Sequence, residues 1–281
     1  MTKAELREYF IKKLGFDRGY QSKNVFEFLM TASEFSKGGV ILDAGAARQR
    51  YKPFFEASIY LTQEHDAGIQ LKNMHHVKYD FINPIDEKIP LKDNCLDAVL
   101  STSVMEHLRY PYNFILEAYR VLKPGGKLFI NVPFVHPEHE TPFDFNRPTR
   151  FGLERWFKDS GFNEYIIQPS SSCTETICHM LPIAFRNDIL RSTKCCSEIL
   201  KDSLRRNDAY GIIRKIPLFF FSKLVWLLSQ AYCRLIRLLL DRGPHVETDF
   251  PVGWIAIATK QGVLKKSIFK DKEDFLNQNR L

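Results

Sequence analysis

The chain has 281 residues, 44% hydrophobic and 26% charged, a composition that excludes a disordered chain and suits one large α/β core with an added element. Its formal net charge of +7 suits an anionic partner, but acidic residues are mixed into the basic stretches, so nucleic-acid binding is not expected. The six cysteines lack the paired spacing of a zinc or redox motif, so we expect free thiols and no metal.

The first 37 residues are predicted to form an N-terminal helical cap. Between residues 3 and 35, apolar positions recur at helical spacing, which predicts two helices that cover the edge of a sheet. The stretch from Met1 to Gly15 has no secretory apolar region and no small-residue cleavage site, so we expect a cytoplasmic protein.

From Gly38 onward, short apolar runs alternate with helical stretches, which predicts βαβ units and a parallel sheet. After a proline- and histidine-rich loop, a helix over 150–160 ends at Gly161, and the last strand is expected to add antiparallel at the sheet edge. The predicted strands cover residues 39–44, 58–62, 76–81, 96–101, 127–132, 162–169 and 253–259.

The predicted fold is α/β: a Rossmann-like, doubly wound, mostly parallel seven-stranded sheet with helices on both faces and a helical insertion before the last strand. Its parts are a core over 38–185, the helical insertion over 186–245, the final strand within 246–262 and a C-terminal tail over 263–281.

The first core strand ends in an acid and a turn of small residues, Asp43, Gly45 and Ala46, with a helix predicted from about Gln49. Such a turn lets a ligand approach backbone amides at a helix N-terminus. Only one glycine of a three-glycine fingerprint is present, so the turn alone does not distinguish a ligand site from an ordinary connection.

Two acids follow at positions that suit a nucleoside. Glu64 lies about 20 residues after the glycine turn, where a ribose-binding acid is expected. Asp80 is a candidate to accept a hydrogen bond from an adenine amino group, with Phe81 or Ile82 packing on the ring; the alternative for Asp80 is a solvated loop acid.

Residues 95–108 (CLDAVLSTSVMEHL) and 117–128 (EAYRVLKPGGKL) resemble the corresponding stretch of class I S-adenosylmethionine-dependent methyltransferases, in particular those of type 11. The resemblance implies S-adenosylmethionine as the cofactor. It places Asp43, Gly45 and Ala46 in the cofactor turn, Glu64 on the ribose and Asp80 with Phe81 at the adenine. Residues that would line the methionine portion are Ser101, Thr102 and Ser103. The chain departs from the commoner turn at Ala46, Ala47 and Arg48.

The loop over 139–149 (HETPFDFNRPT) resembles a subgroup with an H-E-x-P-x-D-F-x-R-x-T pattern that is found in polysaccharide and glycolipid biosynthesis. The resemblance implies a small-molecule or glycan-type acceptor, methylated on oxygen. His107, His136 and His139 follow predicted strands, and histidine is the natural base near neutral pH. We favour His139 as the base; the alternative is that its imidazole is bonded to Asp144 or a carbonyl to hold the loop. His107 is expected to contact the cofactor or cap a helix.

Asp144 and Arg147, three residues apart, are expected to form an ion pair that shapes the loop. The alternative is that Arg147 reaches an anionic substrate, such as a phosphate-bearing sugar.

The insertion contains a long apolar stretch over 216–240, in which Lys223, Arg234 and Arg237 argue against a transmembrane helix. The polar residues of this stretch would lie along one narrow stripe of a helix. Residues 212–241 therefore either pack or form a homodimer, or contact a membrane peripherally with Trp226 and Tyr232 at the interface.

The function predicted from the sequence is in-line methyl transfer from S-adenosylmethionine. The alternative is a catalytically degenerate S-adenosylmethionine-binding scaffold or partner-binding protein. A nicotinamide-dependent dehydrogenase would need a fuller G-x-G-x-x-G turn than this chain has.

Overall fold

The structure is a computed structural model that describes residues 1–14, 20–83, 88–181, 183, 224, 227–228, 231–232, 235 and 250–281. The chain divides into two compact units, Met1–Ser171 with Asp249–Leu281, and Ser172–Thr248. The sheet and the candidate site both belong to the first unit.

The first unit is built on a seven-stranded sheet in the order β3-β2-β1-β4-β5-β7-β6. Neighbouring strands run parallel, except that β7 is antiparallel to both β5 and β6. This confirms the predicted Rossmann-like sheet. The strands are β1 Val40–Ala44, β2 Ile59–His65, β3 Phe81–Asn83, β4 Leu96–Thr102, β5 Leu122–Pro133, β6 Glu164–Pro169 and β7 Gly253–Thr259.

The last strand lies inside the sheet, which corrects the expectation that it would form the edge. β7 is buried along nearly its whole length, whereas β6 alternates between exposed and half-buried residues, with Ile166 64% exposed. An almost wholly apolar strand is better covered between two neighbours, so the more polar β6 takes the edge.

The strand order reverses between β1 and β4, which are hydrogen-bonded neighbours. The chain goes from β1 outward to β2 and β3, and then returns to the other side of β1 with β4. In such sheets the crevice at the carboxyl ends of the two central strands is where ligands bind.

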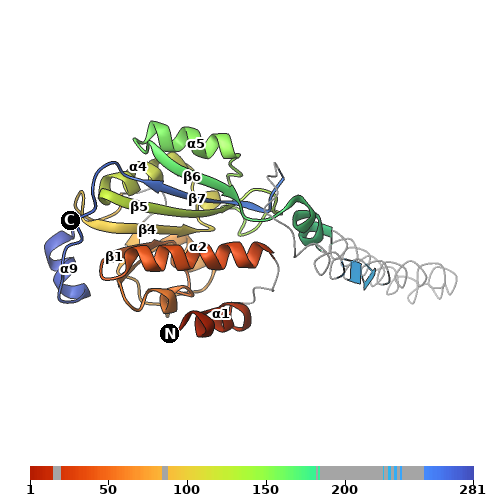
Figure 1. The fold of residues 1–281 in the computed structure, drawn as a ribbon, viewed down its shortest axis with the longest axis horizontal. Helices are drawn as coiled ribbons and strands as arrows, with labels where there is room; N and C mark the ends of the chain where they lie inside the picture. Colours follow the sequence, from red (N-terminus) through yellow and green to blue (C-terminus); the bar gives the residue numbers. More distant parts are fainter. Residues whose placement is uncertain are drawn as a thin grey trace, which may run out of the picture. The chain divides into compact units, whose positions relative to one another are not determined.

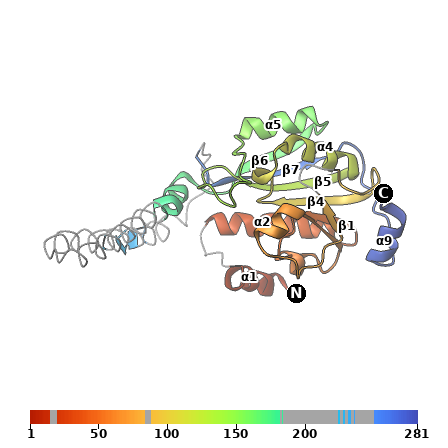
Figure 2. The ribbon, with the colours of Figure 1, turned by 180° about the vertical axis from the view of Figure 1, so that it is seen from behind.

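Helices cover both faces of the sheet (Figures 1 and 2). On one side are α1 (Lys3–Lys12) and α2 (Tyr20–Ser36); on the other are α4 (Pro111–Val121) and α5 (Arg150–Asp159). The expectation that the first two helices cover the sheet edge is wrong: Phe26 and Leu29 share one buried cluster with Leu100 and Phe129 of the central strands. The central strands are apolar on both faces, so each face needs a helical layer.

The segment after β1 forms no α-helix, although the sequence predicts one from about Gln49. Ala47 and Gln49 have φ values of 44° and 53°, in the left-handed region, which a right-handed helix does not allow. The chain turns instead and forms the short 3-10 helix η1 (Lys52–Phe55).

Two other segments differ from the sequence prediction or go beyond it. The third strand begins only at Phe81, after exposed residues His75 and His76 and the short helix α3 (Asp66–Leu71). The C-terminal segment contains the helix α9 (Lys272–Asn279), whose Phe275 is fully buried in the core.

Most of the predicted insertion, including Lys223, Trp226, Arg234 and Arg237, lies outside the described residues. The described positions within it are helical, and their large apolar side chains are at least half exposed: Leu224, Leu227, Leu228, Tyr232 and Leu235. Within the described part of the chain, no helix has the length and apolar character needed to cross a membrane.

Candidate functional site

The turn after β1 is held against the loop after β4. Gly45 has a φ of 79°, and a Cβ atom at this position would lie 2.3 Å from Cγ2 of Val104. The backbone amides of Gly45 and Ala46 donate hydrogen bonds to the carbonyl of Gln63, over 3.0 and 2.9 Å. Only glycine satisfies both the conformation and the close approach, so the predicted small-residue turn lies in the crevice between β1 and β4.

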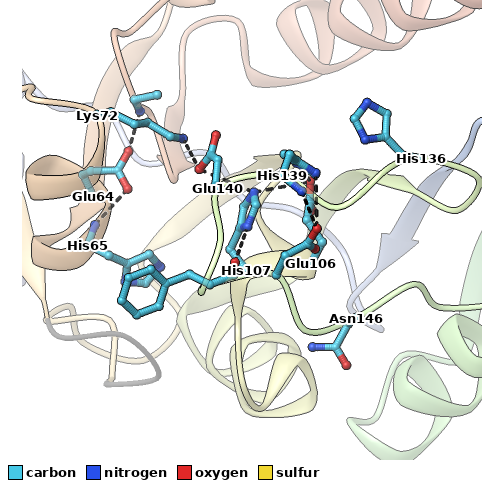
Figure 3. A network of polar contacts seen from close by, with 12 residues as sticks. Glu64, His65, Lys72, Glu106, His107, His136, His139, Glu140 and Asn146 are labelled. Carbon is cyan, nitrogen blue, oxygen red and sulfur yellow. Dashed lines mark hydrogen bonds and ion pairs between the residues drawn. The ribbon is translucent and has the colours of Figure 1, made fainter. Parts of the chain in front are cut away.

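Glu64 lies near the carboxyl end of β2, as the sequence predicts, and its side chain is labelled in Figure 3. It is 5% exposed. Its Oε2 accepts a 2.6 Å hydrogen bond from the Ala47 amide, and its Oε1 accepts one of 2.9 Å from the His65 amide. The carboxylate therefore lies beside the turn that follows β1, where a ligand hydroxyl would meet it.

Asp43 lies in the protein interior at the end of β1 and is fully buried. The Tyr60 hydroxyl donates a hydrogen bond to its Oδ2, while Oδ1 has no hydrogen-bond partner. Burial raises the pKa of Asp43 to about 7; the Tyr60 hydrogen bond opposes this rise and the nearby Glu64 adds to it. Asp43 is thus surrounded by the core of the sheet. Its role in the cofactor turn stays a prediction.

Asp80 and Phe81, the predicted adenine contacts, lie among protein groups. Asp80 Oδ2 accepts hydrogen bonds of 2.8 Å from the Thr62 amide and from Lys272 of α9. Phe81 is 2% exposed, with the Arg280 guanidinium 5.4 Å from its ring centroid. Asn83 is the residue at the carboxyl end of β3, paired in register with His65. The adenine roles of Asp80 and Phe81 stay predictions.

The residues at the end of β4 differ in exposure. Ser101 is fully buried and its hydroxyl has no hydrogen-bond partner, Thr102 is 8% exposed, and Ser103 is exposed with a φ of 53°. Ser103 is tied to β5 by a 2.8 Å hydrogen bond from its amide to the Asn131 carbonyl. A ligand at the strand ends would therefore meet Ser103 before Ser101.

A pocket of about 410 Å³, including space open to solvent, lies at the carboxyl ends of β1 and β2. Ala44, Gly45, Gln63 and Val104 line it together with residues of α4. The side-chain oxygen of Gln63 is buried without a hydrogen-bond donor. The small residues and the unpaired acceptor suit a hydroxyl or amino group of a ligand at this point of the crevice. Gln63 is not among the residues predicted from the sequence, where its only signal is its place before Glu64.

Three of the predicted residues and one further acid meet on the loops after β4 and β5. Glu106 and His107 belong to the 3-10 helix η2 (Met105–His107), and His139 comes from the loop after β5; Figure 3 shows their side chains directed toward one another. Oε1 of Glu106 is 3.7 Å from Nε2 of His107 and 3.7 Å from Nε2 of His139. The Glu106 carboxylate raises the pKa of His139.

His136 is beside this group, with its ring centroid 4.7 Å from that of His139. Burial lowers the pKa of His136, in contrast to that of His139. The three predicted histidines are thus brought together, but their surroundings differ. Burial has the largest effect on the pKa of His136, whereas Glu106 has the largest effect on that of His139.

Asp144 and Arg147 form the ion pair that the sequence predicts, with Nη1 of Arg147 2.5 Å from Oδ1 of Asp144. Burial alone would raise the pKa of Asp144, but hydrogen bonds from Arg147 and the His139 amide hold it at about 2. His139 Nδ1 is 3.4 Å from Asp144 Oδ2. The contacts agree with the interpretation in which this pair shapes the loop and His139 is held within it.

Residues 46–130 match a family model described as a methyltransferase domain. The chain is 37% identical to the tRNA U34 carboxymethyltransferase of Trichlorobacter lovleyi over 76 residues, which are 26% of this chain and 23% of that protein. It is 44% identical to the mitochondrial ubiquinone biosynthesis O-methyltransferase of Mus musculus over 46 residues, 16% of this chain and 12% of that protein. The chain thus spans about a quarter or less of the length of these curated relatives.

One solved structure similar to this chain is phosphoethanolamine N-methyltransferase 2 of Haemonchus contortus in complex with S-adenosyl-L-methionine. The two share 16% identity with a TM-score of 0.44, covering 86% of this chain and 52% of that one. The strand order of the sheet, and not this likeness, establishes the fold.

Proposed function

We propose that the protein is a class I S-adenosylmethionine-dependent methyltransferase and that it transfers a methyl group to a small-molecule or glycan-type acceptor. The observation that carries the proposal is the match of residues 46–130 to a methyltransferase domain, together with the pocket at the carboxyl ends of β1 and β2. S-adenosylmethionine supplies an activated methyl group on a sulfonium centre.

The residues that would hold the cofactor are those of the crevice. Gly45 and Ala46 keep the turn after β1 free of bulk, Glu64 offers carboxylate oxygens to hydroxyl groups, and Gln63 offers an unpaired buried oxygen. We infer that ligand hydroxyls donate to Glu64 beside the Ala47 amide, since a carboxylate oxygen accepts more than one hydrogen bond.

Methyl transfer is an in-line displacement, so the protein's main tasks are to align the acceptor and exclude water. Alignment of reactants is worth up to about 7 to 11 kcal/mol of the barrier. The loop over 139–149, braced by the pair of Asp144 and Arg147, would cover the acceptor side of the crevice. No covalent intermediate on the protein is required.

The assignment of an oxygen acceptor and of His139 as its base remains part of the proposal. In support, His139 lies on a loop after β5, near the end where ligands bind in such sheets. However, both ring nitrogens face protein groups: Nδ1 is 3.2 Å from the Pro137 carbonyl and Nε2 is 3.7 Å from Glu106. Removal of an acceptor proton by His139 would first require Nε2 to be free of its neighbours.

The experiment that tests the proposal is calorimetric titration with S-adenosylhomocysteine, with NAD as a parallel ligand. We expect micromolar binding of S-adenosylhomocysteine alone. Glu64→Gln should weaken it by about 1–3 kcal/mol, because an ionised acceptor is lost from the ligand. Glu34→Gln, at an exposed position on α2, is the matched control and should leave the affinity unchanged.

Each outcome separates the alternatives. Binding without methyl transfer to any of a panel of sugar and phenol acceptors would favour the degenerate scaffold. An absence of binding, or equal affinities for wild type and Glu64→Gln, would overturn the site assignment.

A further inference from the structure

The group formed by Glu106, His107 and His139 contains a carboxylate that accepts no hydrogen bond from the protein. Glu106 is fully buried, yet neither of its oxygens accepts a hydrogen bond. Burying an ionised carboxylate without a partner is strongly unfavourable, so such groups are paired, hydrogen-bonded or bound to a metal. The nearest atoms are the two imidazole Nε2 atoms at 3.7 Å, beyond the range of about 2.7–3.2 Å for a hydrogen bond.

The other nitrogen of each ring faces an acceptor. Nδ1 of His107 is 2.6 Å from the Phe143 carbonyl, so this nitrogen carries the proton and donates. Nδ1 of His139 is 3.2 Å from the Pro137 carbonyl and 3.4 Å from Asp144, both closer than the Arg147 guanidinium at 3.5 Å. In the neutral rings, Nε2 then presents a lone pair.

Two lone pairs and one carboxylate oxygen therefore point at a shared space. The candidate ligand atoms of all three residues lie within 4.8 Å of one another. With both rings neutral, these three acceptors repel each other, and either a proton on one Nε2 or a cation between them removes the repulsion. An ion about 2.0–2.2 Å from each of two ligands would hold those ligands roughly 3–4 Å apart, which agrees with the 3.7 Å separations.

We propose that Glu106, His107 and His139 bind one divalent first-row transition-metal ion, such as Zn²⁺, Co²⁺ or Mn²⁺. Two imidazole nitrogens and one carboxylate suit these ions, whereas Ca²⁺ and Mg²⁺ prefer sites made of oxygen. Three protein ligands leave a coordination position open. The inference goes beyond the proposed function and does not depend on methyl transfer; while the ion is bound, Nε2 of His139 is a ligand and cannot act as a base.

The surrounding backbone fixes the three ligands before any ion arrives. The Glu106 carbonyl accepts hydrogen bonds from the amides of Phe145 and Asn146, over 2.7 and 3.2 Å. The Asn146 side chain donates a 2.6 Å hydrogen bond to the Leu108 carbonyl. The loop after β5 is thereby joined to η2. Metal-bound histidines commonly donate their second N–H to a carbonyl or carboxylate, as the Nδ1 contacts of both rings do here.

Glu140 and Lys72 bound the site on one side. Oε2 of Glu140 is 3.6 Å from Nε2 of His107, but the Lys72 ammonium, 2.8 Å away, already neutralises this carboxylate. We therefore assign the ion to Glu106 and not to Glu140.

The test uses the full chain without a polyhistidine tag, dialysed against a chelator and then titrated with Co²⁺ and with Zn²⁺. We expect one equivalent of metal per chain by elemental analysis, at micromolar affinity or better, and a Co²⁺ absorption spectrum typical of nitrogen ligands. Glu106→Gln and His139→Ala should each weaken binding at least 100-fold. His136→Ala is the matched control, adjacent to His139 but outside the proposed ligand set, and should change the affinity less than threefold.

Near-ultraviolet circular dichroism and S-adenosylhomocysteine titration of each variant report whether it folds and keeps the cofactor crevice. Less than half an equivalent of metal on the wild-type chain would overturn the proposal, whatever the variants do. So would wild-type affinity in Glu106→Gln, or an equal loss in His136→Ala and His139→Ala. Failure to bind S-adenosylhomocysteine with metal binding intact would contradict the proposed function alone.

Discussion

Strand β4 has a fully buried carboxylate at each end, and the two have opposite surroundings. At its amino end, Asp97 accepts a 2.7 Å hydrogen bond from the Val40 amide and pairs with Lys123 at 3.0 Å. Just beyond its carboxyl end, Glu106 accepts none. Burial is equal, so exposure cannot tell a structural acid from a functional one. Whether the carboxylate accepts hydrogen bonds from the protein does tell them apart.

Asp43, at the end of the adjacent strand β1, is intermediate. One of its oxygens accepts a hydrogen bond from Tyr60 and the other accepts none. The three acids therefore form a graded series in the hydrogen bonds that their carboxylates accept, and substitutions at each should differ in a predictable order.

The largest effect is expected for Asp97→Ala. It would leave the Lys123 ammonium, whose side chain is 9% exposed, as an uncompensated buried charge. Breaking a buried pair in this way costs about 3–5 kcal/mol of unfolding free energy, to be measured by denaturant titration. The control, Asp93→Ala, removes a 67% exposed partner of Arg120 and should cost about 0–1 kcal/mol. Similar losses in both variants would show that the buried pair of Asp97 and Lys123 stabilises the fold no more than the exposed pair of Asp93 and Arg120.

Asp43, the intermediate acid of the series, should make the stability of the protein depend on pH. The pKa of Asp43 is raised from 3.8 to about 7 in the folded protein, so its contribution is fully present below about pH 4 and is lost as the pH rises through 7. At about 1.4 kcal/mol for each pKa unit, the shift of about 3 units makes the whole loss on the order of 4 kcal/mol. The unfolding free energy of wild type should therefore fall relative to that of Asp43→Asn between pH 5 and pH 8. A constant difference across this range would contradict the buried, half-paired environment.

These environments also explain how much could be predicted from the sequence. The order of strands and helices in the core, the turn at Gly45 and the place of Glu64 follow from local patterns, since apolar periodicity and glycine punctuation are encoded residue by residue. The exact match of Gly253–Thr259 to β7 is such a case. Its place inside the sheet is not local, because it depends on how polar the competing strand β6 is.

The site around Glu106 shows what local patterns leave out. The Glu106-His107 pair was visible in the sequence, but His139 is remote from it along the chain. The groups that orient both rings are backbone carbonyls, of Phe143 and Pro137, which carry no sequence signature. Likewise, the left-handed conformation of Ala47 and Gln49 results from the tertiary contacts of the turn, including the Tyr79 hydroxyl on the Ala47 carbonyl, and it prevents the predicted helix.

A smaller effect is expected at the contact between the turn after β1 and the loop after β4. Gly45→Ala would place a Cβ atom 2.3 Å from Val104 in a backbone with φ 79°, whereas Gly38→Ala has a similar φ of 70° and nothing within 4 Å. Left-handed strain alone costs about 1 kcal/mol, and overpacking adds about 1–3 kcal/mol. Denaturant titration should therefore show Gly45→Ala less stable than Gly38→Ala by the overpacking part, with recovery in the Gly45→Ala, Val104→Ala double variant. Equal losses of unfolding free energy in the two single variants would mean that Gly45 and Val104 are not in contact.

The smallest effect on stability is expected for Glu106→Gln, because the Glu106 carboxylate accepts no hydrogen bond. In metal-free protein the substitution keeps the side chain's shape and removes a buried charge that accepts no hydrogen bond, so the unfolding free energy should change by less than about 1 kcal/mol, with an increase as the favoured direction. Asp97→Asn is the matched amide substitution at the paired end, and it should cost about 1–3 kcal/mol because it weakens the contact with Lys123. A loss in Glu106→Gln as large as that in Asp97→Asn would show that the Glu106 carboxylate is stabilised by the protein itself, and the contrast between the two ends of β4 would no longer hold.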